Sequence, residues 1–192
     1  MGRGPLIILS GPSGSGKSTI VDRLLREDGW PLRLSVSATT RAARPREEDG
    51  KHYHFWSRER FLQEVAHDAF LEWAEVHGNC YGTLRQEVEP YREQGIGVIL
   101  DIDVKGWEQV KAKCDDAVSI FLKTSNMDVY RERLVRRRTE SEEAIQRRLA
   151  AARAEEARAG EYDYVVINDD LETALAHMRQ IVGPLFERKN HA

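Results

Sequence analysis

The stretch Gly11-Pro12-Ser13-Gly14-Ser15-Gly16-Lys17-Ser18 matches the phosphate-binding pattern G-x-x-x-x-G-K-[ST] at every fixed position. An apolar run over Leu6–Ser10 precedes it and predicts a buried strand, while Ser18–Arg26 follows with the apolar spacing of a helix. Glycines let backbone N–H groups surround a phosphate, and the helix N-terminus adds its positive end. Lys17 can reach the β- and γ-phosphates of a nucleotide, and the Ser18 hydroxyl can coordinate Mg²⁺. The loop therefore predicts nucleotide binding, and it leaves open hydrolysis, phosphoryl transfer or binding alone.

Short apolar runs alternate with helical stretches through the rest of the chain. Further strands are predicted at 97–102, 117–122 and 164–167, and further helices at 104–113, 127–136, 140–159 and 170–188. Thr139-Glu140-Ser141-Glu142 has the pattern of a capping box at the start of the third of these helices. Strands that alternate with helices predict an α/β fold, with a parallel sheet flanked by helices.

The stretch from about 36 to 90 breaks this alternation. It begins with several arginines and continues with short aromatic segments around one predicted helix, at about 58–66. Because about 55 residues would form only a marginal core alone, this stretch is predicted to be a small insertion at the edge of the sheet.

Composition and charge exclude several classes of protein. The 192 residues are 41% hydrophobic and 32% charged, with a net charge of −3, which disfavours a protein that coats nucleic acid or an anionic membrane. The sequence contains neither a membrane-spanning apolar stretch nor a signal-peptide core. Cys80 and Cys114 are not spaced as a redox or zinc pair, and His52 and His54 lack a third metal ligand. We therefore expect reduced thiols, no histidine metal site and a cytoplasmic protein without nucleic-acid or membrane partners.

An acidic residue follows the apolar run Val98-Ile99-Leu100. Asp101 stands at the predicted carboxyl end of this strand, where open α/β sheets bind their ligands, and Asp103 follows two residues later. Asp101 can hold Mg²⁺ directly or through water.

Several side chains between residues 36 and 90 allow two interpretations each. Arg41 and Arg44 could form a solvated charge cluster or an anion site. Tyr53 and Tyr81 could be core aromatics or ligands of a phosphate. Glu72 interrupts the apolar run Phe70–Trp73, and it could face solvent or be a buried functional group.

Eight segments, taken together and in this order, resemble the guanylate kinase family: GPSGSGKST, SVSATTR, GKHYHF, FLEWAEVHGNCYGT, ILDIDVKG, RRRTES, RRLAAA and VINDD. The resemblance covers about residues 4–188. It implies a P-loop kinase that reversibly transfers the ATP γ-phosphate to GMP or dGMP with Mg²⁺ as cofactor, in purine nucleotide metabolism and GMP recycling.

The same resemblance implies an organisation. Residues 1–192 would form a single guanylate kinase-like domain with a core (1–35, 91–125 and 159–192), a GMP-binding insertion (about 36–90) and a mobile lid (about 126–158). ATP and GMP would be its small-molecule partners, and both a monomer and a homo-oligomer are compatible with it.

The resemblance assigns a GMP site. It implies that Arg41, Arg44, Tyr53 and Tyr81 hold the GMP phosphate, that Ser37, Glu72, Thr83 and Asp103 read guanine, and that Glu47 and Asp101 complete the site. Guanidinium forks and phenolic hydroxyls suit a dianionic phosphate. A carboxylate suits guanine because N1–H and the N2 amino group are adjacent donors, whereas adenine presents an acceptor at N1. The Ser37 and Thr83 hydroxyls would donate to guanine O6.

The resemblance also assigns the ATP side. It implies that ATP is bound by Gly11, Pro12, Ser13, Gly14, Ser15, Gly16, Lys17, Ser18, Thr19, Arg133 and Asn168, that Mg²⁺ is held by Ser18 and Asp101, and that catalysis rests on Lys17, Arg41, Arg137 and Arg148. Arg136, Arg138 and Arg147 are expected to be solvated. Asn168 could instead form the turn at the end of its strand or cap the helix that follows it. No general base is needed, because the acceptor phosphate is already ionised.

Two departures from the family's pattern concern this side. Arg138 stands where the family commonly has glycine, and Lys123-Thr124-Ser125-Asn126 stands where relatives often have a proline-containing segment. The first affects the local turn, and the second affects the adenine contacts.

Two other functions fit a phosphate loop. A non-catalytic guanylate-kinase-like binding module typically loses parts of the loop, whereas Lys17, Ser18 and the glycines are intact here. A kinase for another acceptor, such as a sugar phosphate, would not need Glu72, Thr83 and Asp103 together.

Overall fold

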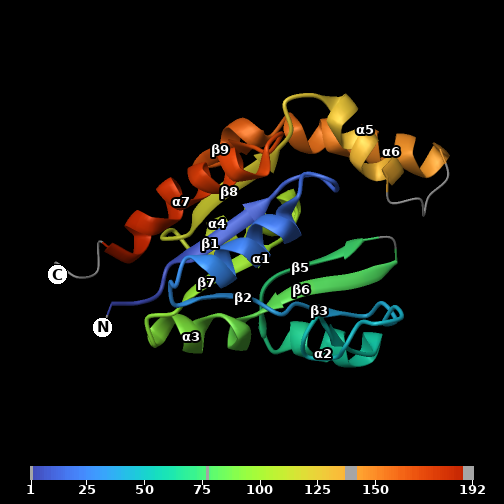
Figure 1. Cartoon of the computed structure of the whole chain (residues 1–192). Coiled ribbons are helices and arrows are strands. Elements are labelled where there is room, and N and C mark those ends of the chain that lie inside the picture. Colours follow the sequence, from blue (N-terminus) through green and yellow to red (C-terminus); the bar gives the residue numbers. More distant parts are fainter. Residues whose placement is uncertain (1, 77, 137–141, 188–192) are drawn as a thin grey trace. The chain divides into compact units, whose positions relative to one another are not determined.

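The computed structural model describes residues 2–76, 78–136 and 142–187, and the chain forms two compact units. Unit 1 comprises Met1–Leu6 and Pro31–Ala117, and unit 2 comprises Ile7–Trp30 and Val118–Ala192. Both units contain parallel strands joined through helices (Figure 1), so the predicted α/β class is confirmed. No helix within the described residues has the length and apolar character needed to cross a membrane.

Unit 2 is built on three parallel strands in the order β1-β8-β9. Its elements are β1 (Leu6–Ser10, in this unit from Ile7 on), α1 (Lys17–Glu27), β8 (Val118–Lys123), α5 (Met127–Arg136), α6 (Glu142–Glu156), a 3₁₀ turn (Ala159–Glu161), β9 (Tyr164–Ile167) and α7 (Leu171–Glu187). Each predicted strand and helix of this unit is present, with ends shifted by up to three residues. The predicted capping box lies mostly outside the described residues.

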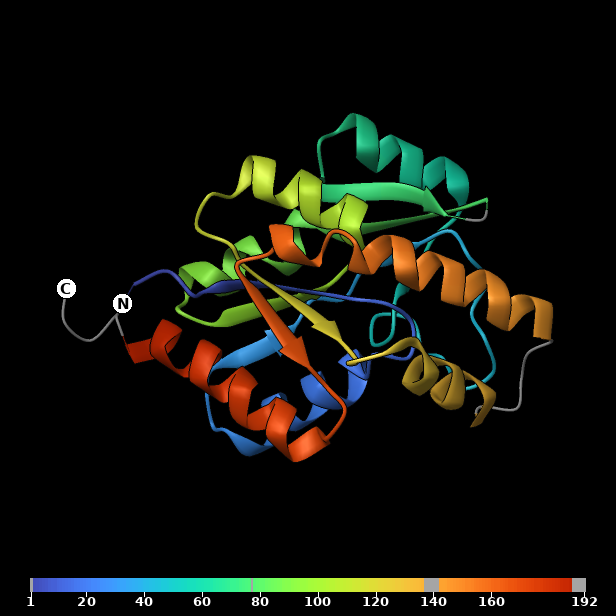
Figure 2. The ribbon, with the colours of Figure 1, turned by 90° about the horizontal axis from the view of Figure 1, so that it is seen from above.

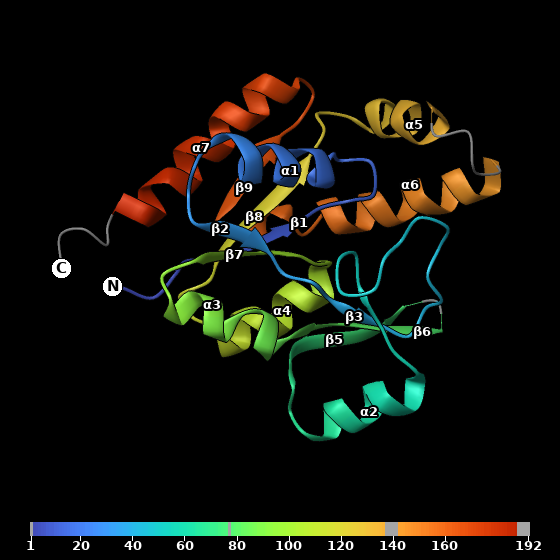
Figure 3. The same ribbon diagram turned by 60° about the horizontal axis from the view of Figure 1, so that its bottom comes forward.

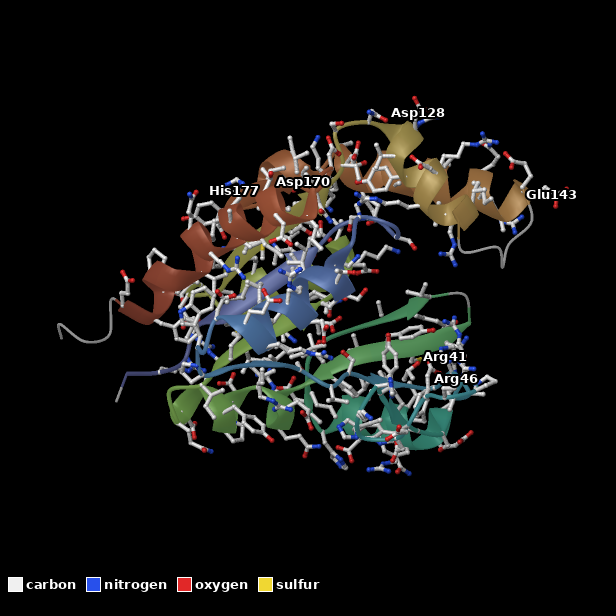
Figure 4. The ribbon with its side chains drawn as sticks, viewed as in Figure 1. Arg41, Arg46, Asp128, Glu143, Asp170 and His177 are labelled. Carbon is white, nitrogen blue, oxygen red and sulfur yellow. The ribbon has the colours of Figure 1, made fainter. Side chains whose placement is uncertain are left out.

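Burial explains why the strands and helices of unit 2 could be predicted from the sequence. All five residues of β1 are buried, as expected for a parallel strand covered on both faces. The first helix, α1, buries Ile20, Val21 and Leu24 on one face. Asp170, labelled in Figure 4, caps α7 by accepting a hydrogen bond from the Thr173 N–H at 2.9 Å. Asp170 is therefore the N-cap of α7, and the alternative that Asn168 caps this helix is wrong.

The helices α5 and α6 pack against each other (Figure 2). Tyr130 and Leu134 of α5 form a buried cluster with Ile145 and Leu149 of α6. The Tyr130 hydroxyl donates to Glu156 Oε1 at 3.0 Å and accepts from the Thr124 N–H at 3.1 Å, so it ties both helices to the end of β8.

The segment after β8 starts α5 without the proline that relatives often have. Asn126 Oδ1 accepts hydrogen bonds from the N–H groups of Asp128 at 3.0 Å and Val129 at 3.2 Å. An asparagine cap thus serves the beginning of this helix.

Unit 1 contains the parallel pair β2–β7 and a four-stranded sheet in the order β4-β3-β6-β5. Its elements are β2 (Leu32–Leu34), β3 (Ala38–Thr39), β4 (His54–Phe55), α2 (Arg58–Ala66), β5 (Phe70–Val76), β6 (Asn79–Leu84), a 3₁₀ turn (Arg85–Glu87), α3 (Glu89–Glu93), β7 (Gly97–Asp101) and α4 (Val104–Lys113). The stretch 36–90 therefore holds a sheet of its own in addition to the predicted helix.

One face of the four-stranded sheet is covered by α2 (Figure 3). Phe61 of α2 stacks on Phe70 with ring centroids 4.5 Å apart, and Cys80 and Leu84 complete this buried cluster. Side chains alternate along a strand, so Tyr81 and Thr83 of β6 point to the opposite face. The strand pairing shifts register between Phe70 and Glu72, which leaves Phe70 on the core side and Glu72 opposite Thr83.

Candidate functional site

The phosphate loop of unit 2 requires glycine at two positions. Gly11 has φ 144° and Gly16 has φ 96°, both in a region that side chains disfavour. A Cβ on Gly11 would lie 2.0 Å from the Leu122 carbonyl oxygen, and one on Gly16 would lie 2.3 Å from Asn168 Nδ2. The loop can therefore keep this path only with glycine at these two positions.

The loop leads into a helix end that favours anions. Gly16 is the N-cap of α1 and offers no capping side chain, and the first turn from Lys17 carries no acidic residue. Lys17 Nζ donates to the Gly11 carbonyl oxygen at 2.6 Å, which keeps the ammonium group on the loop. Backbone N–H groups, the positive helix end and one lysine thus converge on the predicted phosphate position.

Two of the predicted arginines reach the loop from the helices α5 and α6. Arg148 Nη1 donates to Ser13 Oγ at 2.9 Å. Arg133 Nη2 donates to the Asn168 carbonyl oxygen at 2.7 Å, and its Nη1 lies 3.4 Å from the carbonyl oxygens of Gly14 and Ser15. Arg147 is exposed, as expected. Arg137, Arg138 and the side chain of Arg136 lie outside the described residues.

A cleft beside the loop is lined by Gly14, Gly16, Thr19, Arg133, Asn168, Asp169 and Leu171. Asn168 is buried, with 3% of its surface exposed, and its Nδ2 donates to the Ser15 carbonyl oxygen at 2.7 Å. The Asp169 carboxylate accepts from the Ser125 N–H at 2.9 Å, and the hydrogen bonds of the Ser125 side chain and backbone lower the pKa of Asp169. Sequence reasoning missed Asp169 and Leu171, although Asp169 lies within the VINDD segment that carried the resemblance and Leu171 follows it directly.

Unit 1 contains a second cavity, lined by Ser37, Tyr53, Glu72, Ala74, Val76, Tyr81, Gly82, Asp101, Ile102 and Asp103. Its volume is about 220 Å³, several times the ~30 Å³ share of one water molecule. Six of the ten predicted GMP residues are in this lining. Sequence reasoning missed Ala74, Val76, Gly82 and Ile102. The alternation from Glu72 through Ala74 to Val76 along one strand would have indicated the first two.

Glu72 is a buried carboxyl group in the wall of this cavity. It is 5% exposed, and the fully buried Thr83 donates its hydroxyl to Glu72 Oε1 at 2.6 Å. Burial raises the pKa of Glu72 to about 7, the Thr83 hydrogen bond opposes this, and the nearby Asp103 carboxylate adds to it. The interpretation of Glu72 as a solvent-facing residue is therefore wrong, and its role as a functional group stays a prediction. Thr83 was expected to donate to guanine O6, but its hydroxyl donates to Glu72 here.

Asp101, the last residue of β7, and Asp103 line the same cavity. Asp101 and Asp103 are both exposed. The Gly106 N–H donates to Asp103 Oδ1 at 2.9 Å, so Asp103 is also the N-cap of α4. The carboxyl end of this strand thus presents acidic oxygen atoms to the cavity, as the sequence predicted.

Arg41 (Figure 4) is held by an acidic partner rather than being freely solvated. Its Nη1 and Nη2 donate to the two carboxylate oxygens of Glu47 at 2.9 and 3.0 Å. The Arg44 N–H donates to the same carboxylate at 2.7 Å. The Arg41 hydrogen bonds, followed by that of the Arg44 backbone, lower the pKa of Glu47 to about 2. The Arg44 side chain itself is exposed.

Two tyrosines line the cavity next to Arg41. The Tyr53 and Tyr81 rings meet edge to face with centroids 6.2 Å apart, and the Arg41 guanidinium lies 5.6 Å from the Tyr53 ring centroid. Burial raises the pKa of Tyr53. Since both rings line a cavity, the interpretation of them as core aromatics is wrong.

Other polar residues that the sequence singled out serve local structure. The His54 ring Nε2 lies 3.1 Å from Glu87 Oε1, and the His52 ring accepts from the Glu48 N–H at 3.0 Å. Cys80 is buried in the core under α2. Across the parts of the chain that the structure describes, no group of three or more His, Cys, Asp or Glu side chains is placed to hold a metal ion.

Comparison with known proteins gives a consistent result. A family model described as guanylate kinase matches residues 3–184. A guanylate kinase from Rubrobacter xylanophilus is 50% identical over 95% of this chain and 95% of its own length. One from Shewanella oneidensis is 46% identical over 94% of this chain and 87% of its own length.

Solved structures agree with these sequence matches. The crystal structure of guanylate kinase from Anaplasma phagocytophilum is similar with a TM-score of 0.76 and 32% identity, over 95% of this chain and 86% of that one. The family model and the relatives each cover nearly all of the sequence, including the phosphate loop and the cavity that holds Glu72. The chain therefore belongs to the guanylate kinase family.

Proposed function

We propose that this protein transfers the γ-phosphoryl group of ATP to GMP or dGMP and releases ADP and GDP or dGDP. As a guanylate kinase, it is a nucleoside monophosphate kinase. The observation that carries the choice of acceptor is the buried Glu72, which lies in the wall of the unit 1 cavity and accepts a hydrogen bond from the buried Thr83.

Guanine matches the donors and acceptors of this wall. A Glu72 carboxylate accepts from guanine N1–H and from the N2 amino group, which lie side by side. The hydroxyl of Thr83 already donates to one carboxylate oxygen and orients the group. Adenine would bring an acceptor at N1 against that carboxylate and leave its second oxygen buried without a donor, which costs about 3 kcal/mol. Ser37, in the same lining, supplies a hydroxyl for guanine O6.

The GMP phosphate has donors on the same side of unit 1. Tyr53 and Tyr81 present phenolic hydroxyls in the cavity, and Arg41 lies beside Tyr53. Glu47 orients the Arg41 guanidinium through two hydrogen bonds. Arg44, exposed on the same loop, adds a second positive charge for the dianion.

ATP is assigned to unit 2. Its β- and γ-phosphates would be bound by the backbone N–H groups of the loop, by Lys17 and by the N-terminus of α1. The cleft beside the loop, with Asn168 and Leu171 in its lining, receives the adenosine part. Arg148 and Arg133 already bond to this loop, and they offset the repulsion between the two anionic reactants, a role also assigned to Arg137.

The resemblance assigns Mg²⁺ to Ser18 of unit 2 and Asp101 of unit 1. Ser18 and Asp101 are exposed and carry hydroxyl and carboxylate oxygens, the hard donors that Mg²⁺ prefers. When bound, Mg²⁺ neutralises phosphate charge during transfer. No general base is assigned, because the attacking phosphate oxygen of GMP is already ionised at neutral pH.

The reaction is reversible and returns GMP to the purine nucleotide pool. The two nucleotides are assigned to different units, and direct transfer requires that their phosphates meet where water is excluded. Otherwise the γ-phosphate would be lost to hydrolysis.

The test is a coupled ADP-release assay with Mg·ATP and a panel of GMP, dGMP, AMP, CMP, UMP and a sugar phosphate. We expect turnover with GMP and dGMP and at most traces with the others. Turnover with a different acceptor would leave a kinase but overturn the guanine assignment. A folded protein that binds GMP and turns over none of the panel would instead be a binding module.

A further inference from the structure

The helix α4 bonds to the strand β5 on both sides of Glu72. The Trp73 N–H donates to Gln109 Oε1 at 3.2 Å, and Gln109 Nε2 donates back to the Trp73 carbonyl oxygen at 2.9 Å. Lys113 Nζ donates to the Leu71 carbonyl oxygen at 2.7 Å. Gln109 and Lys113 are four residues apart and share one face of α4.

These bonds replace a missing neighbouring strand. The strand β5 is the last in the order β4-β3-β6-β5, so its outer edge has no strand partner within that sheet. The backbone groups on such an edge need other partners. The Gln109 amide offers one donor and one acceptor, the same pair that a residue of an adjacent strand would offer to Trp73.

Gly106 continues the same face of the helix. A Cβ at this position would lie 2.9 Å from Glu72 Oε2 and 3.2 Å from its carboxyl carbon. The backbone of α4 therefore packs directly against the Glu72 carboxyl group, and any side chain here would push that group aside. Thr83 holds the other carboxylate oxygen, so the group is fixed from two sides.

We propose that Gly106, Gln109 and Lys113 are positioning residues that hold Glu72 in register for guanine, and that they thereby set the selectivity for GMP over other nucleoside monophosphates. The inference rests on the proposed function. Neither Gln109 nor Lys113 belongs to the cavity lining, so both act through the backbone of β5.

The test compares Gln109→Met and Lys113→Met with matched controls in the full chain. Gln94→Met and Lys111→Met remove the same groups from Gln94, which bonds to the Pro90 carbonyl oxygen, and from Lys111, which bonds to that of Ala117. We expect KM for GMP to rise about tenfold in the two test variants, since one or two hydrogen bonds hold the strand. The preference for GMP over AMP should fall by a similar factor, while kcat and KM for ATP stay within about twofold.

Two further variants separate positioning from mere stability. Lys113→Arg keeps a donor of similar reach and should restore KM for GMP. Gly106→Ala removes a glycine from the helix and should still weaken GMP binding, because its methyl group displaces Glu72. If Gly106→Ala fails to fold, the Gln109 and Lys113 variants decide alone.

Glu72→Gln and the wild type serve as references. The inference is overturned if Glu72→Gln loses GMP use while Gln109→Met and Lys113→Met keep wild-type KM and selectivity. Equal losses for ATP and GMP, or a loss that only follows a lower unfolding midpoint, would also overturn it. A wild type that does not phosphorylate GMP would overturn the proposed function itself and this inference with it.

Discussion

Replacing Glu72 by glutamine should change how stability depends on pH, because Glu72 is an acid held in a buried wall. Glutamine has nearly the same shape and keeps an oxygen that can accept from Thr83. It cannot ionise, so it removes the cost of a buried charge and little else. The change therefore isolates the electrostatic consequence of burial at this one position.

The magnitude follows from the raised pKa of Glu72, which is about 7 instead of 4.5. Between these two pH values the folded protein binds more protons than the unfolded chain, so Glu72 lowers the free energy of unfolding as pH rises. One unit of pKa difference corresponds to about 1.36 kcal/mol. The ionisation of Glu72 therefore lowers the free energy of unfolding by about 3 kcal/mol at pH 8 and by only about 1 kcal/mol at pH 5.5. The free energy of unfolding of Glu72→Gln, relative to that of the wild type, should therefore increase by about 2 kcal/mol from pH 5.5 to pH 8.

Urea unfolding of the two proteins without nucleotides, at pH 5.5 and pH 8, measures this difference. Glu93→Gln, at an exposed position on α3, is the control and should follow the wild type at both pH values. A stability difference between Glu72→Gln and the wild type that is equal at the two pH values would refute the reasoning, since it would mean that Glu72 is not buried as an acid.

Three other variants test the assigned roles. Lys17→Ala should lower turnover by about a thousandfold or more, because it removes the ammonium group on the phosphate loop, while the unfolding midpoint stays close to that of the wild type. Arg148→Ala should lower kcat about a hundredfold and change KM for GMP less than about threefold, if it acts on the transition state; steady-state kinetics with both substrates varied decides this. Glu47→Gln should raise KM for GMP about fivefold without changing KM for ATP, because it loosens Arg41. An equal change in both Michaelis constants would contradict that role.

The parts of the fold that were predicted well from the sequence have an unbroken run of apolar residues or a recognisable motif. The strand β1 is buried along its whole length, so its apolar run was unambiguous, and the glycine spacing of the next segment could be recognised directly. The strands β3 and β4 have two residues each, too few to show an alternation of apolar and polar residues. The four-stranded sheet of unit 1 therefore escaped sequence reasoning.

The candidate site also has features that could be predicted from the sequence and features that could not. Residue types indicated which side chains would bind phosphate and guanine, and Glu72 stood out because it interrupts an apolar run. The sequence could not tell that Thr83 donates to Glu72, or that Gln109 and Lys113 bond to the backbone on either side of it. The Thr83 contact depends on the register between two strands, and the Gln109 and Lys113 contacts depend on how a helix meets a strand more than thirty residues away in the sequence. No local pattern records either.

The central claim is that Glu72 makes GMP the acceptor, and the ratio of kcat/KM for GMP to that for AMP tests it most directly. We predict a ratio of about a hundred or more for the wild type and a collapse of that ratio in Glu72→Gln, through loss of GMP use with little change in KM for ATP. An unchanged ratio in Glu72→Gln, or a wild type that uses AMP as well as GMP, would contradict it.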